Sequence, residues 1–309
     1  MSNMFSSLFS GSRNRKMMIV VAATAALLVV ALLSLAIIGI INAVRNNAPE
    51  EEEAPAPTNT IPTGFKEVDF TVGLHSGNLI LTNDTYAFQG TTPTVNLKDT
   101  RPSNPNPDSQ HPMYTVHYDN PPLVTQETSD AFQAMMLAFC AQNAGACENI
   151  VVDIPNEALY HNGLTVRMRY LVDGAPVPMT PNDTYKWIFE NAHLYGFVQM
   201  FEAPAEGDTE AVSQEHIFRY VGEVHAQMMK DLKAKNKVTT FESYLAYLRE
   251  NAANPSKPLS VTINKVTYKV YYLAKDAKQI LPEKYESTCV VSGDNMTGYI
   301  ITYSTATKK

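Results

Sequence analysis

An uncharged apolar run, residues 17–42, constrains this chain more than any other feature of its sequence. The run is MMIVVAATAALLVVALLSLAIIGIIN, and it is longer than the roughly 20 residues that an α-helix needs to cross a bilayer. A cleavable signal peptide has a shorter apolar core of about 7–15 residues and a small-residue cleavage site, and neither is evident here. Residues 17–42 are therefore predicted to be an uncleaved transmembrane helix.

The flanking charges predict the orientation of this helix. Arg13, Arg15 and Lys16 directly precede the run, whereas Arg45 is soon followed by the glutamates at 50–53. The positive-inside rule places the more basic flank in the cytoplasm. Residues 1–16 are accordingly expected to be a cytoplasmic tail. Everything after residue 45 is expected to be extracytoplasmic, so the sequence predicts a single-pass protein of the cell membrane.

Charge is unevenly distributed along the chain. Four of the 24 basic residues and none of the 31 acidic residues precede residue 50, so the remainder has 20 basic and 31 acidic side chains and a formal net charge of −11. Such a domain repels the phosphates of nucleic acids, which excludes nucleic-acid binding. Residues 43–62 combine acidity with Pro and Ala and have no apolar period, which is typical of an extended linker.

Beyond residue 62 the apolar periodicity changes repeatedly between helix and strand. Helices are expected at 125–145, 182–197, 223–236 and 240–251. Strands are expected as broken runs in 68–84, at 148–154, 163–174 and 217–222, and as two strand pairs in 258–309. This order predicts an α+β fold rather than a βαβ repeat. It consists of a main domain, residues 63–254, and a C-terminal β segment, residues 255–309.

The three cysteines are too few for a scaffold built on disulfides. Cys140 and Cys147 flank the end of a predicted helix, and they can form a bridge if their Cα atoms come within about 7 Å. The alternative is that both are small apolar side chains buried in the core. The sequence leaves the two possibilities open.

Three segments carry a resemblance to a known family. They are YKWIFENAHLYGF (185–197), FRYVG (218–222) followed by a helix, and TFESYLAYL (240–248). Their order and spacing resemble the second half of the zinc D-alanyl-D-alanine carboxypeptidases, which trim peptidoglycan stem peptides and include vancomycin-resistance D,D-carboxypeptidases and L,D-carboxypeptidases. The resemblance covers roughly residues 65–250. It implies a hedgehog/D,D-peptidase-like fold, an antiparallel sheet with helices, in a bacterial protein whose partner is a cell-wall peptide or an envelope protein.

The family's metal site gives an expectation for four positions. Its zinc is held by the His and Asp of a Ser-x-His-x6-Asp segment and by a second His before the FRYVG-like element, while a Glu acts as general base on the bound water. Aligned on Gly163 and on FRYVG, the ligand positions hold Tyr160, Arg167 and Ile217, and the base position holds Gln214. The resemblance thus implies a degenerate member with no catalytic residues and no cofactor.

An alternative site would use two histidines that lie one position away from the family's ligands. His161 and His216 would then bind zinc in an active D-Ala-D-Ala or L,D-carboxypeptidase with a rearranged site. A shift of one residue in a strand turns the side chain to the opposite face of the sheet, so this alternative needs a bulge as well as a third ligand. His193 and Trp187, in contrast, are expected to be structural.

Two arginines are candidates for binding rather than catalysis. Arg167 and Arg169 are two residues apart on one predicted strand and share a face, so they are possible contacts, with His161 and His216, for a carboxylate of a substrate or partner. The alternative for the arginines is a salt-bridged strand face. The sequence favours a binding or scaffolding module at the cell wall over an enzyme. A purely structural role, with residues 258–309 as the working surface, is the third possibility.

Overall fold

The computed structural model describes residues 60–97, 115–116, 122–181, 184–200 and 216–306. The chain divides into two compact units, Met1–Ala56 and Pro57–Lys309, and every described helix and strand lies in the second. No helix within the described ranges is long and apolar enough to span a bilayer, and the run at 17–42 lies outside them. The cytoplasmic tail, the transmembrane helix and the linker therefore stay predictions.

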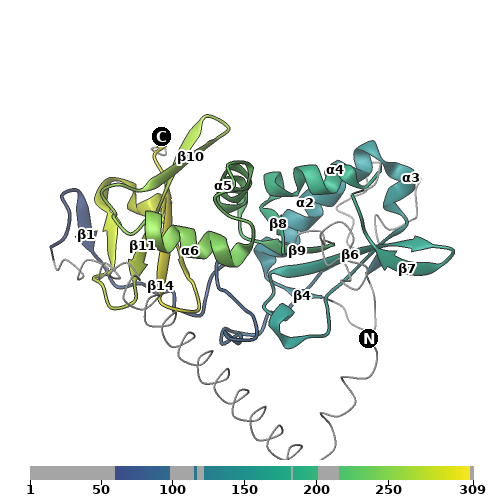
Figure 1. The fold of residues 1–309 in the computed structure, drawn as a ribbon, viewed down its shortest axis with the longest axis horizontal. Coiled ribbons are helices and arrows are strands. Elements are labelled where there is room, and N and C mark those ends of the chain that lie inside the picture. Colours follow the sequence, from purple (N-terminus) through teal and green to yellow (C-terminus); the bar gives the residue numbers. More distant parts are fainter. Residues whose placement is uncertain (1–59, 98–114, 117–121, 182–183, 201–215, 307–309) are drawn as a thin grey trace, which may run out of the picture. The chain divides into compact units, whose positions relative to one another are not determined.

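A six-stranded sheet carries the segments that resemble the carboxypeptidases (Figure 1). Its strands are β3 (Thr115–Val116), β5 (Ile150–Asp153), β6 (Thr165–Val172), β7 (Ala175–Pro178), β8 (Phe197–Gln199) and β9 (Ile217–Tyr220). Their order is β3-β5-β6-β9-β8, with β7 also paired to β6. Every pairing is antiparallel except that of β3 with β5. The predicted combination of helices with antiparallel strands is confirmed, with one parallel exception.

Helices cover one face of this sheet, as Figure 1 shows for α2 and α4. They are α2 (Gln126–Gln142), α3 (Ala144–Cys147), α4 (Lys186–Asn191) and the 3-10 helix η3 (Ala192–Tyr195). The side chain of Thr125 caps α2, since it accepts a hydrogen bond from the Thr128 amide. Gly196 ends η3. This residue has a φ of 81°, a conformation that glycine adopts without strain.

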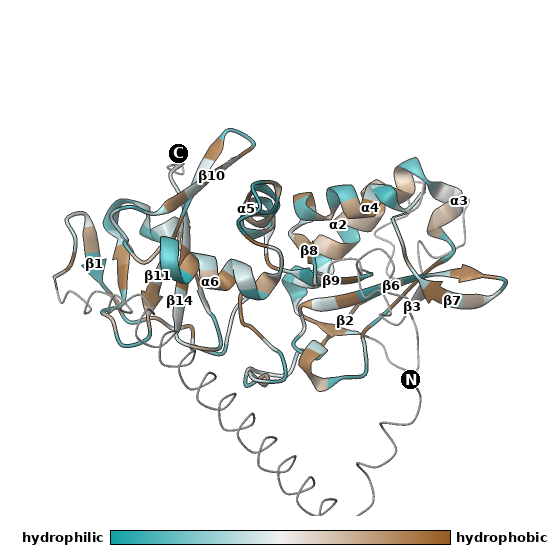
Figure 2. Ribbon diagram, in the orientation of Figure 1, coloured by the Kyte–Doolittle hydropathy of each residue, from teal (hydrophilic) through white to brown (hydrophobic). Residues whose placement is uncertain are grey.

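Packing between these helices and the sheet forms the first hydrophobic cluster. Apolar and polar residues alternate along the first part of β6 (Figure 2), so one set of its side chains points toward the helices. Val166 and Met168 of β6 are fully buried there against Phe132 and Phe139 of α2. Trp187 packs at the edge of the same cluster, as expected for a structural residue.

The C-terminal residues form a second, four-stranded sheet of order β10-β11-β14-β13. The strands are β10 (Leu259–Ile263), β11 (Val266–Ala274), β13 (Val290–Gly293) and β14 (Gly298–Ser304). They form the two predicted strand pairs, and Asn264 and Lys265 make the first turn with positive φ values of 50° and 68°. Helices α5 (Glu223–Ala234) and α6 (Phe241–Asn251) share one apolar cluster with this sheet. The C-terminal β segment is therefore packed directly against the last two helices of the carboxypeptidase-like region.

Residues 65–90 also contact the C-terminal strands. Strand β1 (Phe65–Glu67) pairs with β12 (Ile280–Pro282), which precedes the 3-10 helix η4 (Glu283–Thr288). The predicted strand runs in 68–84 are wrong, because these residues form turns and irregular backbone. Their backbone groups bond to separate partners instead of one neighbouring strand. For example, the Leu79 amide donates to Ser292 Oγ (3.0 Å), and Asn295 Nδ2 donates to the Leu81 carbonyl (2.7 Å).

Two short strands and one disulfide complete the described structure. Strand β2 (Val95–Asn96) pairs with β4 (Leu123–Val124), and Cys140 is bonded to Cys147 with their Cα atoms 5.4 Å apart. The disulfide was one of two possibilities that the sequence left open. All hydrophobic clusters of the described residues lie within 57–309, so this unit has a core of its own, and we expect it to fold without residues 1–56.

Candidate functional site

Two of the family's ligand positions come together in the middle of the six-stranded sheet. Arg167 of β6 is the direct partner of Ile217 on β9, and on its other side it is the partner of Asp153 on β5. Side chains that are directly opposite on neighbouring strands share a face. Asp153, Arg167 and Ile217 therefore form one row across three strands, on the face away from α2. This is the geometry that two ligands of a single metal would need.

The third ligand position lies beside this row. Tyr160 ends the 3-10 helix η2 (Ala158–Tyr160) and is buried, with 6% of its surface exposed. Burial raises the pKa of its phenol, the acids Glu157 and Asp84 raise it further, and the positive charge of Arg167 acts in the opposite direction. The structure thus makes Arg167 and Ile217 direct partners and places Tyr160 near enough to Arg167 for that charge to act on the phenol.

The chemistry of these three residues is unlike that of a zinc site. Arg167 donates from Nε and from Nη2 to the two carboxylate oxygens of Asp153, each at 2.7 Å, and Arg169 Nη2 donates to the same carboxylate at 2.5 Å. Asp153 is buried, with 3% of its surface exposed. These hydrogen bonds raise the pKa of the Arg167 guanidinium, so its charge is permanent. Two cations facing one anion leave a net positive charge at the position of the family's metal.

The two alternative histidines have different environments. One ring nitrogen of His161 is hydrogen-bonded to a backbone carbonyl, and His216 points away from this row. His161 Nε2 lies 3.0 Å from the Pro155 carbonyl oxygen, and since a carbonyl only accepts, this nitrogen carries the proton, which leaves Nδ1 as the ring's acceptor. The carbonyl of His216 accepts from the Met168 amide at 2.9 Å, which extends the β6-β9 ladder by one residue. His216 therefore pairs with Met168 on the helix-covered face, opposite to Ile217.

The donor set at this site does not fit zinc. A zinc site needs three or four neutral or anionic N, O or S ligands, and the three aligned positions hold a phenol, a guanidinium and an aliphatic side chain. The nearest carboxylate, Asp153, is neutralised by two arginines. In the part of the chain that the structure describes, no three His, Cys, Asp or Glu residues are grouped as a metal site. Gln214, at the position of the general base, lies outside the described residues.

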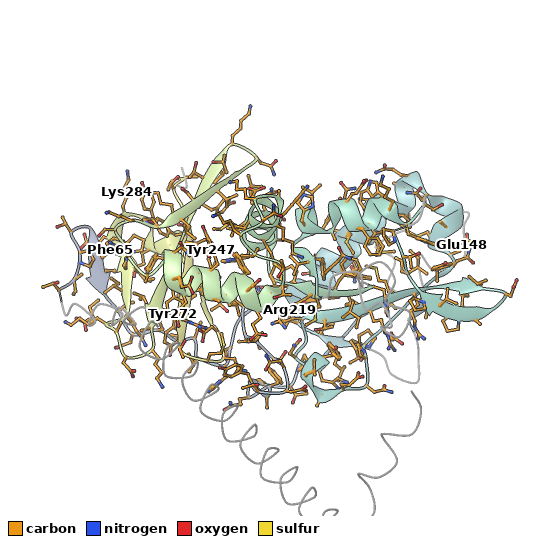
Figure 3. The ribbon with its side chains drawn as sticks, in the orientation of Figure 1. Phe65, Glu148, Arg219, Tyr247, Tyr272 and Lys284 are labelled. Atoms are coloured by element: carbon orange, nitrogen blue, oxygen red, sulfur yellow. A yellow bond between two sulfur atoms is a disulfide. The ribbon has the colours of Figure 1, made fainter. Side chains whose placement is uncertain are left out.

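Arg219 of the FRYVG element has a structural environment (Figure 3). Its side chain is fully buried, Nη2 donates to the Ile80 carbonyl, and the guanidinium lies 4.6 Å from the ring centroid of Phe241 on α6. Burial lowers the pKa of this guanidinium to about 9. Arg219 thus connects β9 to α6 and to the segment before β2, and it does not reach the row of Asp153, Arg167 and Ile217.

Comparison with known proteins agrees with the fold and with the resemblance in sequence. No family model matches the chain. A D-alanyl-D-alanine carboxypeptidase of Enterococcus faecium is 34% identical over 121 residues, which are 38% of this chain and 35% of that protein. Over these 121 residues the chain is similar to a D-alanyl-D-alanine carboxypeptidase. It spans about a third of the length of the curated relative that it matches.

Solved structures were also compared with the fold of this chain. The vancomycin-resistance D,D-dipeptidase VanXYg, in complex with a D-Ala-D-Ala phosphinate analogue, has a TM-score of 0.51 at 18% identity and covers 75% of this chain and 95% of its own. The LD-carboxypeptidase LdcB has a TM-score of 0.31 at 19% identity, over 40% of this chain and 68% of its own. The first of these likenesses shows that the chain shares the fold of the D,D-peptidases.

Asp153 is the residue that sequence reasoning missed. The sequence gives two alternatives for Arg167 and Arg169, a contact for a foreign carboxylate and a salt-bridged strand face, and the structure has the salt bridges, with Asp153 as the carboxylate. A signal was present, because an aspartate that ends the apolar run IVV is buried and a buried carboxylate needs a partner of opposite charge. Arg167 and Arg169, two residues apart on the next strand, were the available partners.

Proposed function

We propose that this chain is a membrane-anchored, extracytoplasmic binding protein whose carboxypeptidase-like domain has lost catalysis. The observation that carries the proposal is the row Asp153–Arg167–Ile217, together with Tyr160. A charged guanidinium occupies the place where the family holds a divalent cation, and its charge repels such an ion. The domain then acts on the cell wall by binding peptides or an envelope partner rather than by cleaving them.

A peptide carboxylate is the ligand that this charge distribution suits. Arg167 and Arg169 keep 26% and 18% of their side-chain surface exposed, while the side chain of Asp153, which they share, is 4% exposed. The outward side of the cluster is therefore cationic, and arginine pairs with carboxylates through geometrically defined hydrogen bonds. The VanXYg complex contains a D-Ala-D-Ala analogue, so a stem peptide ending in D-Ala-D-Ala is the first ligand to test.

The binding experiment uses residues 57–309 and a synthetic stem peptide that ends in D-Ala-D-Ala. Titration calorimetry should detect binding of the free acid and at least tenfold weaker binding of the C-terminal amide, which lacks the charge. Arg169→Gln should weaken binding of the acid and leave that of the amide unchanged. Lys257→Gln, an exposed lysine before β10, is the matched control. Equal affinity for acid and amide, or none for either, would contradict the proposed role.

The membrane location rests on residues 17–42 and on the disulfide. Disulfides persist in oxidising compartments outside the cytoplasm, which agrees with an outward-facing domain that contains Cys140–Cys147. Fractionation of bacterial cells expressing the full chain should recover it in the membrane pellet, and removal of residues 1–42 should release it. Added protease should digest the C-terminal domain in cells whose outer layers are opened but whose cytoplasmic membrane is intact. Protection of the domain in those cells would contradict the predicted orientation.

A further inference from the structure

A cavity lies on the opposite side of the sheet from the candidate site, between η3, α5 and the strands β8 and β9. Its volume is about 470 Å³, which is in the range of pockets that bind small molecules. Phe197, Phe218 and Met229 form an apolar floor and wall, and His193, Lys230 and Lys233 contribute polar groups. Figure 1 shows α5 next to β8 here.

Strand alternation separates this cavity from the candidate site. Ile217 and Phe218 are consecutive residues of β9, so their side chains point to opposite faces of the sheet. Ile217 lies in the row with Arg167, whereas Phe218 lines the cavity. A ligand in the cavity therefore contacts none of the positions that correspond to the family's metal site.

The polar part of the cavity has an excess of positive charge. Lys230 Nζ donates to His193 Nε2 at 2.9 Å. Burial is the main cause that lowers the pKa of His193, and the positive charge of Lys230 lowers it further. The ring is therefore neutral, and its Nε2 accepts the hydrogen bond. The single acid among the lining residues, Glu190, faces Lys186 with an N to O distance of 3.4 Å. Lys230 and Lys233 are thus the cations of the lining beside the apolar floor, and the carboxylate of Asp231, outside the lining, also acts on His193.

We propose that this cavity binds a carboxylate attached to an apolar body. The apolar body would lie on Phe197, Phe218 and Met229, and the carboxylate would accept hydrogen bonds from the ammonium of Lys230, which a neutral imidazole holds at the edge. Such a charge-assisted hydrogen bond is roughly twice as strong as a neutral one. A lysine bonded to a neutral histidine keeps its whole charge available for an anion.

The carboxylate has two possible sources, a free apolar acid or the C-terminal residue of a peptide. Binding to residues 57–309 is measured by titration calorimetry with 4-phenylbutanoate for the first source and with acetyl-Ala-Phe for the second. Each probe is paired with its amide, which has the same apolar body without the charge. At least one of the two acids should bind, and should bind at least tenfold more tightly than its amide.

Variants locate the binding. Lys230→Gln should reduce the affinity of the acid about tenfold without affecting the amide, since a charge-assisted hydrogen bond is replaced by a neutral one. Met229→Trp should abolish binding of both by filling the cavity. Lys257→Gln is the control, and thermal unfolding checks that each variant is folded. If Met229→Trp does not fold, the chemical-shift changes that the acid causes in wild-type protein must map to β8 and α5. Equal affinity for acids and amides, no binding of either acid, or unchanged affinity in Lys230→Gln would overturn the proposal.

Discussion

His225 allows the packing of α5 and α6 on the C-terminal sheet to be tested by pH. Its ring is buried between these elements, with Nδ1 2.7 Å from Tyr244 Oη on α6 and Nε2 2.7 Å from Thr302 Oγ1 on β14. No carboxylate contacts the ring among the described residues. Burial lowers the pKa of His225 to about 3. The imidazole is therefore neutral in the folded protein at any pH that the protein normally meets.

The size of the effect follows from proton linkage. The unfolded chain has a histidine pKa of about 6.5, above the folded value, so the unfolded state takes up the proton first as the pH falls. The contribution of His225 to stability is complete above the unfolded pKa and is lost as the pH decreases toward the folded pKa of about 3. Between about pH 7.5 and pH 5 this loss is about 2 kcal/mol of unfolding free energy.

Urea unfolding of residues 57–309 measures this loss. We expect His225→Gln to be less stable than the wild type near neutral pH and to lose about 2 kcal/mol less on acidification to about pH 5. Other titrating groups contribute equally to both proteins and cancel in the difference. His161→Gln removes a histidine outside the cluster and is the control. If the variant does not fold, NMR titration of the wild-type His225 ring replaces the comparison. A ring that titrates near its ordinary pKa would refute the reasoning.

The remaining predictions concern the disulfide, Arg219 and Asp153. Reducing Cys140–Cys147, whose sequence separation is 7, should lower the free energy of unfolding by about 2 kcal/mol, measured by urea unfolding with and without dithiothreitol. The free energy of unfolding of Arg219→Met should stay within about 1 kcal/mol of the wild type, because the loss of the hydrogen bond to Ile80 is offset by the removal of a buried charge. Arg219→Ala should lower it by about 3 kcal/mol, because the small side chain leaves a cavity. Thermal and urea unfolding distinguish the two. Asp153→Asn should cost about 2–3 kcal/mol by leaving two arginines facing each other, and the cost should shrink at high salt. An Asp153→Asn variant as stable as the wild type would mean that the cluster does not hold β5 to β6.

The ends of helices and strands were predictable where the sequence contains capping or turn residues. Thr125 caps α2, Gly196 ends the helix before β8, and the turn after β6 is formed by Asp173 and Gly174, both with positive φ. Residues 68–84 have strand-like composition but no strand to pair with, so their backbone bonds to scattered groups of the C-terminal region. Only the tertiary structure decides whether such a segment finds a partner strand.

The candidate site was predictable in position and not in its internal bonding. The alignment on Gly163 and FRYVG placed Arg167 and Ile217 at two ligand positions, and the register of β6 and β9 makes them direct partners. The links that the sequence did not indicate are those between distant residues. Arg219 packs on Phe241, and His225 contacts Thr302 across 77 positions. The apolar period of a sequence indicates which face of a helix or strand is buried. It does not identify the distant residue that pairs with a buried polar side chain on that face.

Zinc content is the measurement that tests the loss of catalysis most directly. Residues 57–309, incubated with excess zinc and then gel-filtered, should retain far less than one zinc per chain and should release no D-alanine from muropeptides. Restoring the family's ligands as Tyr160→His, Arg167→Asp and Ile217→His should increase the retained zinc, because Arg167 and Ile217 share one face of the sheet and Tyr160 lies within electrostatic range of Arg167. One zinc per wild-type chain, with release of D-alanine, would contradict the account.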